Sequence, residues 1–224
     1  MAEHDGHRAR LKSRFLEHGL DTFDDHTVLE LLLFYAMPRQ DTNVTAHRLL
    51  DTFGSLDAVF EADMQALTAV KGVGENAATL IRLTPEIGRR YMLSKERTGT
   101  VLRTSADAGR FLIPRFIHAG SEQLYLVCMD AGLRVLDCVL MAGGDTTNVG
   151  FNVRQVVTTA LQHKADAVIL SHNHLTGIAL PSDEDIQATL RVREALNVVG
   201  ITLADHIIVA GNDFVSLADD GVLT

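Results

Sequence analysis

The chain has 224 residues, of which 46% are hydrophobic, and it carries a formal net charge of −9. This length suits two small domains, and the apolar content is sufficient for packed cores. No apolar run approaches the roughly 20 residues of a membrane helix, and the first residues lack the apolar segment of a signal peptide. We therefore expect a cytoplasmic protein without membrane contact. Two cysteines are too few for a disulfide-stabilised scaffold.

Residues 1–98 are predicted to form an all-helical domain, and residues 101–224 a second domain. Apolar helical patterns, each followed by a helix-breaking or polar segment, occupy residues 27–35, 45–53 and 56–60. Pro38 ends the first of these helices, and Gly54 is a suitable C-cap for the second. The segment 94–100 is polar and unpatterned, which predicts a linker between the two domains.

A Gly-x-Gly turn, Gly72-Val73-Gly74, separates two helical segments of the first domain. Glycine permits a tight turn and close backbone approach, so the pattern resembles a helix-hairpin-helix, whose turn amides hold a DNA phosphate. In that interpretation Lys71, Gly72 and Gly74 contact the DNA backbone. The alternative is a hairpin that only packs within the domain. Residues 1–100 carry 12 basic and 15 acidic residues, whereas nucleic-acid binders are normally basic, so both interpretations stay open.

The second domain alternates strands and helices. Runs rich in apolar and β-branched residues predict strands over residues 122–129, 133–141, 165–170, 201–210 and 214–217. Helices are predicted over residues 105–111, 152–163 and 182–199. This order predicts an α+β domain in which helices cover a mixed sheet.

The two cysteines lie on the strands of the first predicted hairpin of this domain. With Ala131-Gly132 as a two-residue turn, Cys128 is expected opposite Val135, and Cys138 opposite Tyr125. That register keeps the sulfur atoms apart. Both residues are therefore predicted to be reduced and buried and to behave as small hydrophobic side chains.

The segment Ser171-His172-Asn173-His174 follows the predicted strand 165–170, and Ser182 and Asp185 follow at the spacing H-x-H-x7-S-x-x-D. Both histidines are expected just past the strand end, and residues two apart on an extended chain point to the same side. Two imidazoles and one carboxylate are a common catalytic zinc set that leaves a fourth position for water. The alternatives are solvated loop histidines and a helix capping box formed by Ser182 and Asp185, which is compatible with a metal site.

A hydrolytic metal site also needs a base that takes and returns a proton. Glu122 is the sole glutamate between Glu96 and Glu184, and it opens a predicted strand. A glutamate at the mouth of a strand can point into a site built on neighbouring strands. The alternative is an ordinary polar residue at a strand start.

These residues resemble the JAMM signature of MPN (JAB) metallopeptidases, and the whole chain resembles the bacterial RadC family. The matching positions are Glu122, His172, Asn173, His174, Pro181, Ser182, Asp185, the segments 205–209 and 214–217, and the N-terminal segment 71–74. The resemblance implies an N-terminal helix-hairpin-helix module and an α/β/α sandwich with a mixed sheet, similar to that of cytidine deaminases.

The resemblance also implies roles for single residues. The implied ligands of one zinc ion are His172, His174 and Asp185. Glu122 would be the general acid and base, and Ser182 would stabilise the oxyanion of a tetrahedral intermediate. Asn173 would brace the turn. His206 would either orient a zinc ligand or simply be hydrogen-bonded in the core.

The chain departs from the family pattern at two places. Leu175-Thr176-Gly177 stands where the family usually has Pro-Ser-Gly, and Gln155 stands where it usually has a glutamate. The positions of the metal ligands are unaffected. The departures bear on the shape of the loop beside the metal and on the substrate.

The sequence therefore predicts a zinc metalloprotease-like hydrolase in which metal-activated water attacks an amide or isopeptide carbonyl of a protein or peptide substrate. The alternative is a nucleic-acid-binding protein associated with DNA repair or recombination, with a structural or vestigial metal site. Substrate and oligomeric state stay open.

Overall fold

The computed structural model describes residues 2–38, 40–95, 99–117, 119–143, 152–175 and 177–223. The chain divides into two compact units, Met1–Gly88 and Arg89–Thr224. The division falls inside helix α6 (Glu75–Ser94), upstream of the predicted linker, and residues 96–98 of that linker lie outside the described residues. Among the described helices, none is long and apolar enough to cross a membrane.

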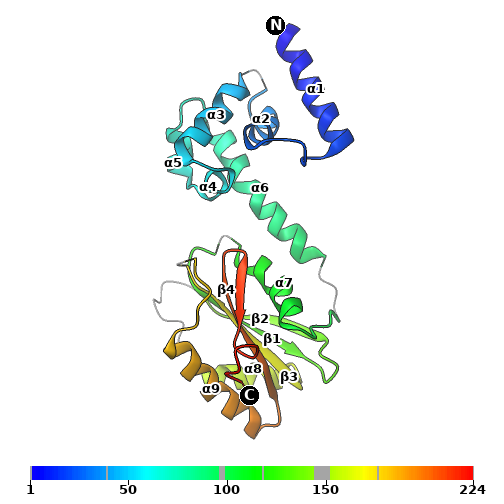
Figure 1. Cartoon of the computed structure of the whole chain (residues 1–224), viewed down its shortest axis with the longest axis vertical. Helices are drawn as coiled ribbons and strands as arrows, with labels where there is room; N and C mark the ends of the chain where they lie inside the picture. The colour runs from blue at the N-terminus through cyan, green and yellow to red at the C-terminus, as the bar shows by residue number, and fades with distance from the viewer. Residues whose placement is uncertain are drawn as a thin grey trace. The chain divides into compact units, whose positions relative to one another are not determined.

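The N-terminal unit is helical, as predicted (Figure 1). Its helices are α1 (Ala2–His18), α2 (Asp25–Ala36), α3 (Thr42–Phe53), α4 (Leu56–Glu61), α5 (Met64–Ala69) and the first part of α6. Side chains that accept hydrogen bonds from first-turn N–H groups begin four of them, namely Asp24, Asp41, Ser55 and Asp63. Gly54 ends α3 in the left-handed conformation, with φ of 90°. The three predicted helices are thus confirmed as α2, α3 and α4.

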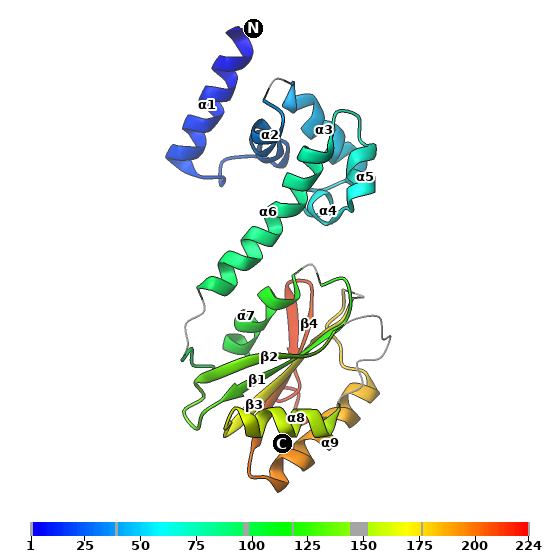
Figure 2. The ribbon, with the colours of Figure 1, turned by 180° about the vertical axis from the view of Figure 1, so that it is seen from behind.

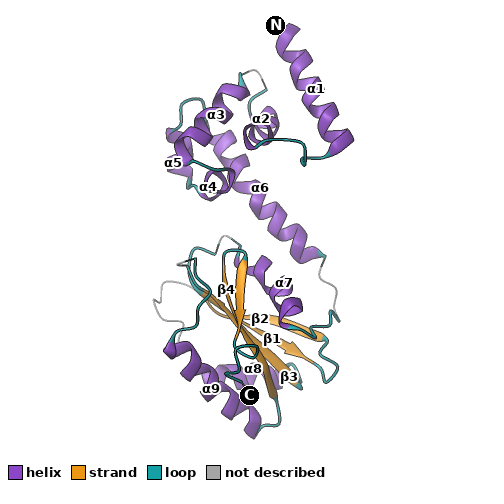
Figure 3. Ribbon diagram, viewed as in Figure 1, coloured by secondary structure: helices purple, strands orange, loops and turns teal. Residues whose placement is uncertain are grey.

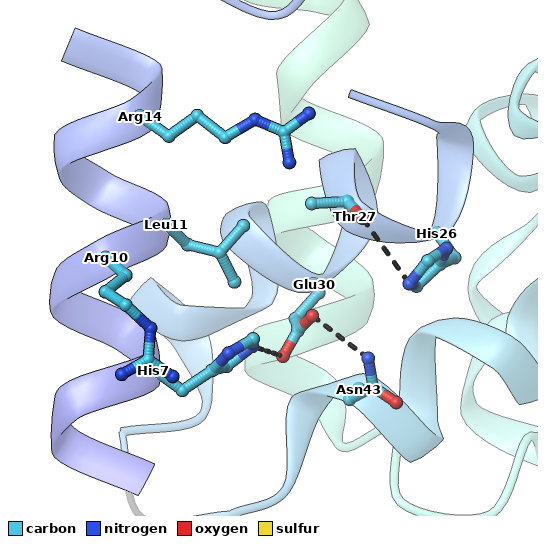
Figure 4. A pocket seen from close by; sticks show the side chains of 8 residues that line it. All are labelled: His7, Arg10, Leu11, Arg14, His26, Thr27, Glu30 and Asn43. Carbon is cyan, nitrogen blue, oxygen red and sulfur yellow. Dashed lines mark hydrogen bonds and ion pairs between the residues drawn. The ribbon is translucent and has the colours of Figure 1, made fainter. Parts of the chain in front are cut away.

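Helix α1 was not predicted individually because it has few apolar residues and a weak helical pattern. It is attached to α2 and α3 through the buried carboxylate of Glu30, which is 3% exposed. One oxygen of this carboxylate lies 3.0 Å from His7 Nε2, and Asn43 Nδ2 donates to the other oxygen at 3.1 Å; Figure 4 shows how the three side chains face one another. The three residues line a cavity of about 270 Å³. Because Glu30 bonds to a side chain on each neighbouring helix, it holds the three helices together.

We expect Glu30→Ala to lower the free energy of unfolding of the N-terminal unit by about 1–3 kcal/mol, because His7 and Asn43 lose a charged hydrogen-bond acceptor. Urea unfolding followed by circular dichroism measures this change. Glu61→Ala is the matched control, since Glu61 is an exposed helical glutamate. Equal stability of the two variants would contradict the role given to Glu30.

The C-terminal unit is built on one five-stranded sheet with the strand order β2-β1-β3-β4-β5. The strands are β1 (Gln123–Met129), β2 (Val135–Gly143), β3 (Ala167–Asn173), β4 (Thr202–Ala210) and β5 (Asp213–Ser216). β3 and β4 are parallel, and the other neighbouring pairs are antiparallel. The sheet is therefore mixed, as predicted (Figure 3).

Helices cover both faces of this sheet (Figures 1 and 2). Helix α7 (Ser105–Phe116) covers one face, and α8 (Val153–Gln162) and α9 (Asp183–Val198) cover the other. Every residue of β3 is buried, because the strand is central in the sheet and covered on both faces. A polar side chain on β3 therefore lies in the interior unless it is close to the strand end.

The predicted register of the first hairpin is wrong. Cys128 lies opposite Asp137, and Cys138 opposite Val127. The cause is a longer turn, because the Asp130 carboxylate accepts hydrogen bonds from the Gly132 and Arg134 N–H groups, and a bulge follows at the end of β1. Asp130 thereby stabilises a turn that is longer than the two-residue turn predicted from the sequence.

Both cysteines are nevertheless free thiols, as predicted, but only Cys128 is buried as expected, because Cys138 lies on the edge strand β2 and is half-buried. Cys128 belongs to the core on the α8 and α9 side, whereas Cys138 packs against the core on the α7 side. Burial raises the pKa of the Cys128 thiol to about 12. The protonated, buried thiol of Cys128 is consistent with a structural role.

Candidate metal centre

Two of the three predicted ligands come from the end of β3. His172 lies within the strand and is 3% exposed, so the expectation that it follows the strand end is wrong. The N–H group of His174 donates to the carbonyl oxygen of Val209 on β4 at 2.8 Å, which continues the strand pairing by one residue. The chain therefore stays extended through both histidines. Their side chains point to the same side of the sheet, toward α9.

The third predicted ligand comes from the first turn of α9. Ser182 is the N-cap of this helix, and its Oγ accepts a hydrogen bond from the Asp185 N–H group at 3.1 Å. The Asp185 carboxylate accepts in return from the Ser182 N–H group at 2.9 Å and from Ser182 Oγ at 2.6 Å. This is the predicted capping box, and it orients the carboxylate back toward β3.

The three side chains converge on one point. His172 Nε2 and His174 Nε2 are 2.9 Å apart, and the two oxygens of the Asp185 carboxylate lie 3.3 Å from His172 Nε2 and 3.5 Å from His174 Nε2. Ligands at a zinc–nitrogen distance of about 2.0–2.1 Å and a tetrahedral angle are roughly 3.3 Å apart. The side chains of His174 and Asp185 are 17% and 15% exposed, so the point is open on one side.

The atoms that face this point can also supply the electron pairs that a metal cation requires. His174 Nδ1 faces the carbonyl oxygen of Ile178 at 3.3 Å. Since a carbonyl oxygen only accepts, Nδ1 carries a hydrogen, and in the tautomer with hydrogen on Nδ1 alone the ring presents a lone pair at Nε2. This lone pair and the carboxylate face the same point as His172 Nε2. The described residues thus fit a divalent cation, whose identity two nitrogens and one oxygen do not determine.

The Asp185 carboxylate is ionised at this site. Burial opposes its charge, but the neighbouring His172 imidazole and hydrogen bonds from the Ser182 N–H group and hydroxyl outweigh burial and hold the pKa of Asp185 well below its usual range. An ionised carboxylate is the form that binds metal. His206, which is completely buried beside His172, has its pKa lowered by burial and is therefore a neutral imidazole.

Glu122 lies immediately before β1 and is half-buried. In the pairing of β1 with β3, Leu124 is opposite His172. Continuing this register by two residues places Glu122 opposite His174, on the edge of the sheet that carries the metal-ligand candidates. Glu122 therefore lies at the start of β1, beside the end of β3 that carries the two histidines.

The side chain of Asn173 holds the segment that carries Glu122. Its Oδ1 accepts from the Gln123 N–H group at 2.7 Å, and its Nδ2 donates to the carbonyl oxygen of Ser121 at 3.3 Å. Asn173 therefore bonds to the residue on each side of Glu122. The sequence suggested a brace for the turn after the histidines, and the hydrogen bonds are instead to the neighbouring strand.

We expect Asn173→Ala to speed amide hydrogen exchange across residues 121–125 by about fivefold, because a lost hydrogen bond of about 1 kcal/mol makes local opening easier. Hydrogen-exchange mass spectrometry measures this rate. Asn197→Ala, at an exposed position of α9, is the control and leaves the segment unchanged. Unchanged exchange in both variants would show that Asn173 does not hold the segment.

Two further polar side chains, those of His206 and Thr189, lie beside the three ligand candidates. His206 lies on β4, with its Nε2 2.8 Å from His172 Nδ1, so it is in contact with a ligand candidate. Thr189 was missed, and its Oγ1 is 2.6 Å from His206 Nδ1. Its spacing of four residues from Asp185, on the buried face of the same helix, is the signal that could have identified it.

The residues proposed for DNA contact lie in the N-terminal unit. Lys71, Gly72 and Gly74 form the turn between α5 and α6, as the hairpin interpretation requires. Gly72 has φ of 100°, and a Cβ atom there would lie 3.1 Å from Thr45 Oγ1. The glycine is therefore needed both for the turn and for packing against α3.

Comparison with known proteins defines the class. A family model described as the RadC-like JAB domain matches residues 102–222. The chain belongs to the RadC family. It is similar to a UPF0758 protein of Ruegeria pomeroyi, at 33% identity over 217 residues and 97% of each chain. It is also similar to UPF0758 proteins of Fusobacterium nucleatum, at 29% identity and 100% of each chain, and of Rhodobacter capsulatus, at 33% identity over 95% of this chain and 100% of the other.

Proposed function

We propose that this protein is a zinc-dependent hydrolase that cleaves amide bonds in a protein or peptide substrate. The observation that supports the proposal most strongly is the convergence of the Nε2 atoms of two histidines and the Asp185 carboxylate, all within 4.8 Å, at a point that is open on one side. Bound zinc would supply a water molecule with a pKa lowered to about 7 and would polarise the substrate carbonyl.

Glu122 is proposed as the general base and acid. Its carboxylate would accept a proton from the attacking water and return it to the leaving amine, since a glutamate within hydrogen-bond reach of both can serve in turn. The position of Glu122 just before β1, with Asn173 bonded to the residue on each side of it, supports this role. The hydrogen bonds keep the backbone of the general base close to the histidines.

Ser182 is proposed as the donor to the developing oxyanion. In the structure the Ser182 hydroxyl donates a hydrogen bond to the Asp185 carboxylate, at an oxygen–oxygen distance of 2.6 Å. Donation to an oxyanion therefore requires the hydroxyl to rotate away from Asp185. Ser182 is exposed at the start of α9, so this rotation is sterically free.

The loop between His174 and Ser182 is the surface that a bound peptide would meet first. Three of its large apolar side chains are more than half exposed, namely Leu175 at 55%, Ile178 at 59% and Leu180 at 66%. Exposed apolar groups beside a reaction centre favour a substrate with an apolar side chain next to the scissile bond. Leu175 is one of the residues at which this chain departs from the family pattern.

The test is cleavage of a library of peptides and isopeptide-linked peptides by the full chain loaded with zinc, followed by mass spectrometry. We expect cleavage that a chelator abolishes and added zinc restores, with enrichment of apolar residues next to the cleaved bond. Absence of cleavage by the zinc-loaded chain, or cleavage that the chelator leaves unchanged, would contradict the proposal.

DNA binding is the second candidate function, and the observation that favours it is the exposed Lys71 beside the glycine turn of the hairpin. A phosphate could bind the free amides where α6 begins. Fluorescence anisotropy with labelled duplex DNA tests this function. Binding that falls with rising salt and is weakened by Lys71→Ala would support it.

A further inference from the structure

Three buried polar side chains, those of Thr189, His206 and His172, form a line of hydrogen bonds on the face of the sheet that α9 covers. We call this line of hydrogen bonds the file; it connects α9 to the ligand candidate His172. Thr189 and His206 are completely buried, and His172 is 3% exposed. Thr189 Oγ1 lies 2.5 Å from the Asp185 carbonyl oxygen and 2.6 Å from His206 Nδ1, and His206 Nε2 lies 2.8 Å from His172 Nδ1. The file thus begins at the backbone of one ligand candidate and ends at the ring of another.

The direction of each hydrogen bond in this file follows from its first member. The Thr189 hydroxyl donates its single hydrogen to the Asp185 carbonyl oxygen, which can only accept. Toward His206, the hydroxyl oxygen can then only accept, so the hydrogen of a neutral His206 ring is on Nδ1. The lone pair of His206 Nε2 accepts in turn from Nδ1–H of His172.

These hydrogen-bond directions determine whether His172 Nε2 carries a hydrogen or a lone pair. A neutral His172 ring that carries its hydrogen on Nδ1 has a lone pair on Nε2, the atom that faces His174 and Asp185. If the file ran in the opposite direction, His206 would donate to His172 Nδ1, and Nε2 would carry the hydrogen. An N–H group at Nε2 cannot bind a metal ion, so the direction of the file decides whether His172 is a ligand.

We propose that Thr189 and His206 are positioning residues that hold His172 in the tautomer with hydrogen on Nδ1 and thereby present Nε2 to the metal. The proposal rests on the metal site of the proposed function but not on hydrolysis. Thr189 has a second effect, because it is bonded to the residue that supplies the carboxylate ligand. The Thr189 hydroxyl thus links the position of α9 to the tautomer of His172 on β3.

The test compares three forms of the full chain, namely wild type, Thr189→Val and Thr189→Ser. Valine keeps the shape of threonine but removes the hydroxyl, whereas serine retains the hydroxyl. We expect Thr189→Val to weaken zinc affinity by about 10–100-fold, the usual effect of removing a group that orients a ligand. Thr189→Ser is expected to bind zinc within about threefold of wild type, since its hydroxyl can make the same bonds. Competition with a chromophoric chelator measures these affinities.

Nitrogen NMR of the His172 ring in the zinc-free protein gives a second, independent readout. The wild-type chain is expected to show a protonated Nδ1 and a bare Nε2, and Thr189→Val a changed ratio of the two tautomers. A wild-type spectrum with hydrogen on Nε2 would overturn the proposal without any variant. Equal zinc affinity and equal spectra in wild type and Thr189→Val would overturn it as well. Failure of the wild type to bind zinc would instead contradict the proposed function, while the ring spectrum still tests the file.

Discussion

Glu122→Gln is expected to reduce amide hydrolysis by about 10²–10⁴-fold, the usual contribution of a general acid or base. Glutamine has nearly the same shape as glutamate but cannot accept a proton from water. Because Glu122 is not among the three converging ligand candidates, the zinc content of the variant is expected to equal that of wild type. The measurements are the rate of cleavage of the best library peptide and the zinc content by mass spectrometry.

Glu184→Gln is the matched control for this prediction. Glu184 is an exposed glutamate in the first turn of α9, next in sequence to the ligand candidate Asp185. The control variant is expected to keep its hydrolytic rate within about twofold of wild type, because surface substitutions rarely perturb a site. Full hydrolytic rate in Glu122→Gln would exclude Glu122 as the general base. Loss of zinc in Glu122→Gln would instead make Glu122 a metal ligand.

His174→Ala is expected to lower zinc affinity by more than about 100-fold, because removing a direct ligand costs more than removing a group that only orients one. Two protein ligands would remain where a catalytic zinc site has three. The metal content after gel filtration is expected to fall from about one zinc per chain to near zero.

Thermal unfolding gives a complementary measure of the same change. Zinc at 100 times its dissociation constant stabilises the folded state by about 2.7 kcal/mol, so zinc is expected to raise the melting temperature of wild type but not of His174→Ala. His163→Ala is the control, because His163 lies on the same unit and pairs with Asp137 at 3.1 Å, away from the converging ligands. Equal zinc stabilisation of all three proteins would place the zinc elsewhere.

Local features of the site were predictable from the sequence. Alternation along an extended chain places His172 and His174 on one side, and the spacing from Ser182 to Asp185 specifies a capping box. Both features depend only on residues within a few positions of each other. The same holds for the helix ends at Pro38 and Gly54, and for the alternation of strands and helices in the second unit.

Features that depend on distant residues were not predictable in this way. The hydrogen bond between His172 and His206 joins residues 34 positions apart, and it follows from the parallel pairing of β3 with β4. The bonds from Asn173 to the segment around Glu122 depend on the pairing of β1 with β3. The hairpin register was missed because the Asp130 side chain, not the loop length assumed, determines the turn.

The measurement that tests the central claim most directly is anomalous X-ray diffraction at the zinc edge from crystals of the full chain grown with zinc. The account predicts one peak per chain, at about 2.0–2.2 Å from His172 Nε2, His174 Nε2 and an oxygen of Asp185, which are ordinary zinc–ligand distances. A peak at other residues, or no peak at these three side chains with zinc present, would contradict it.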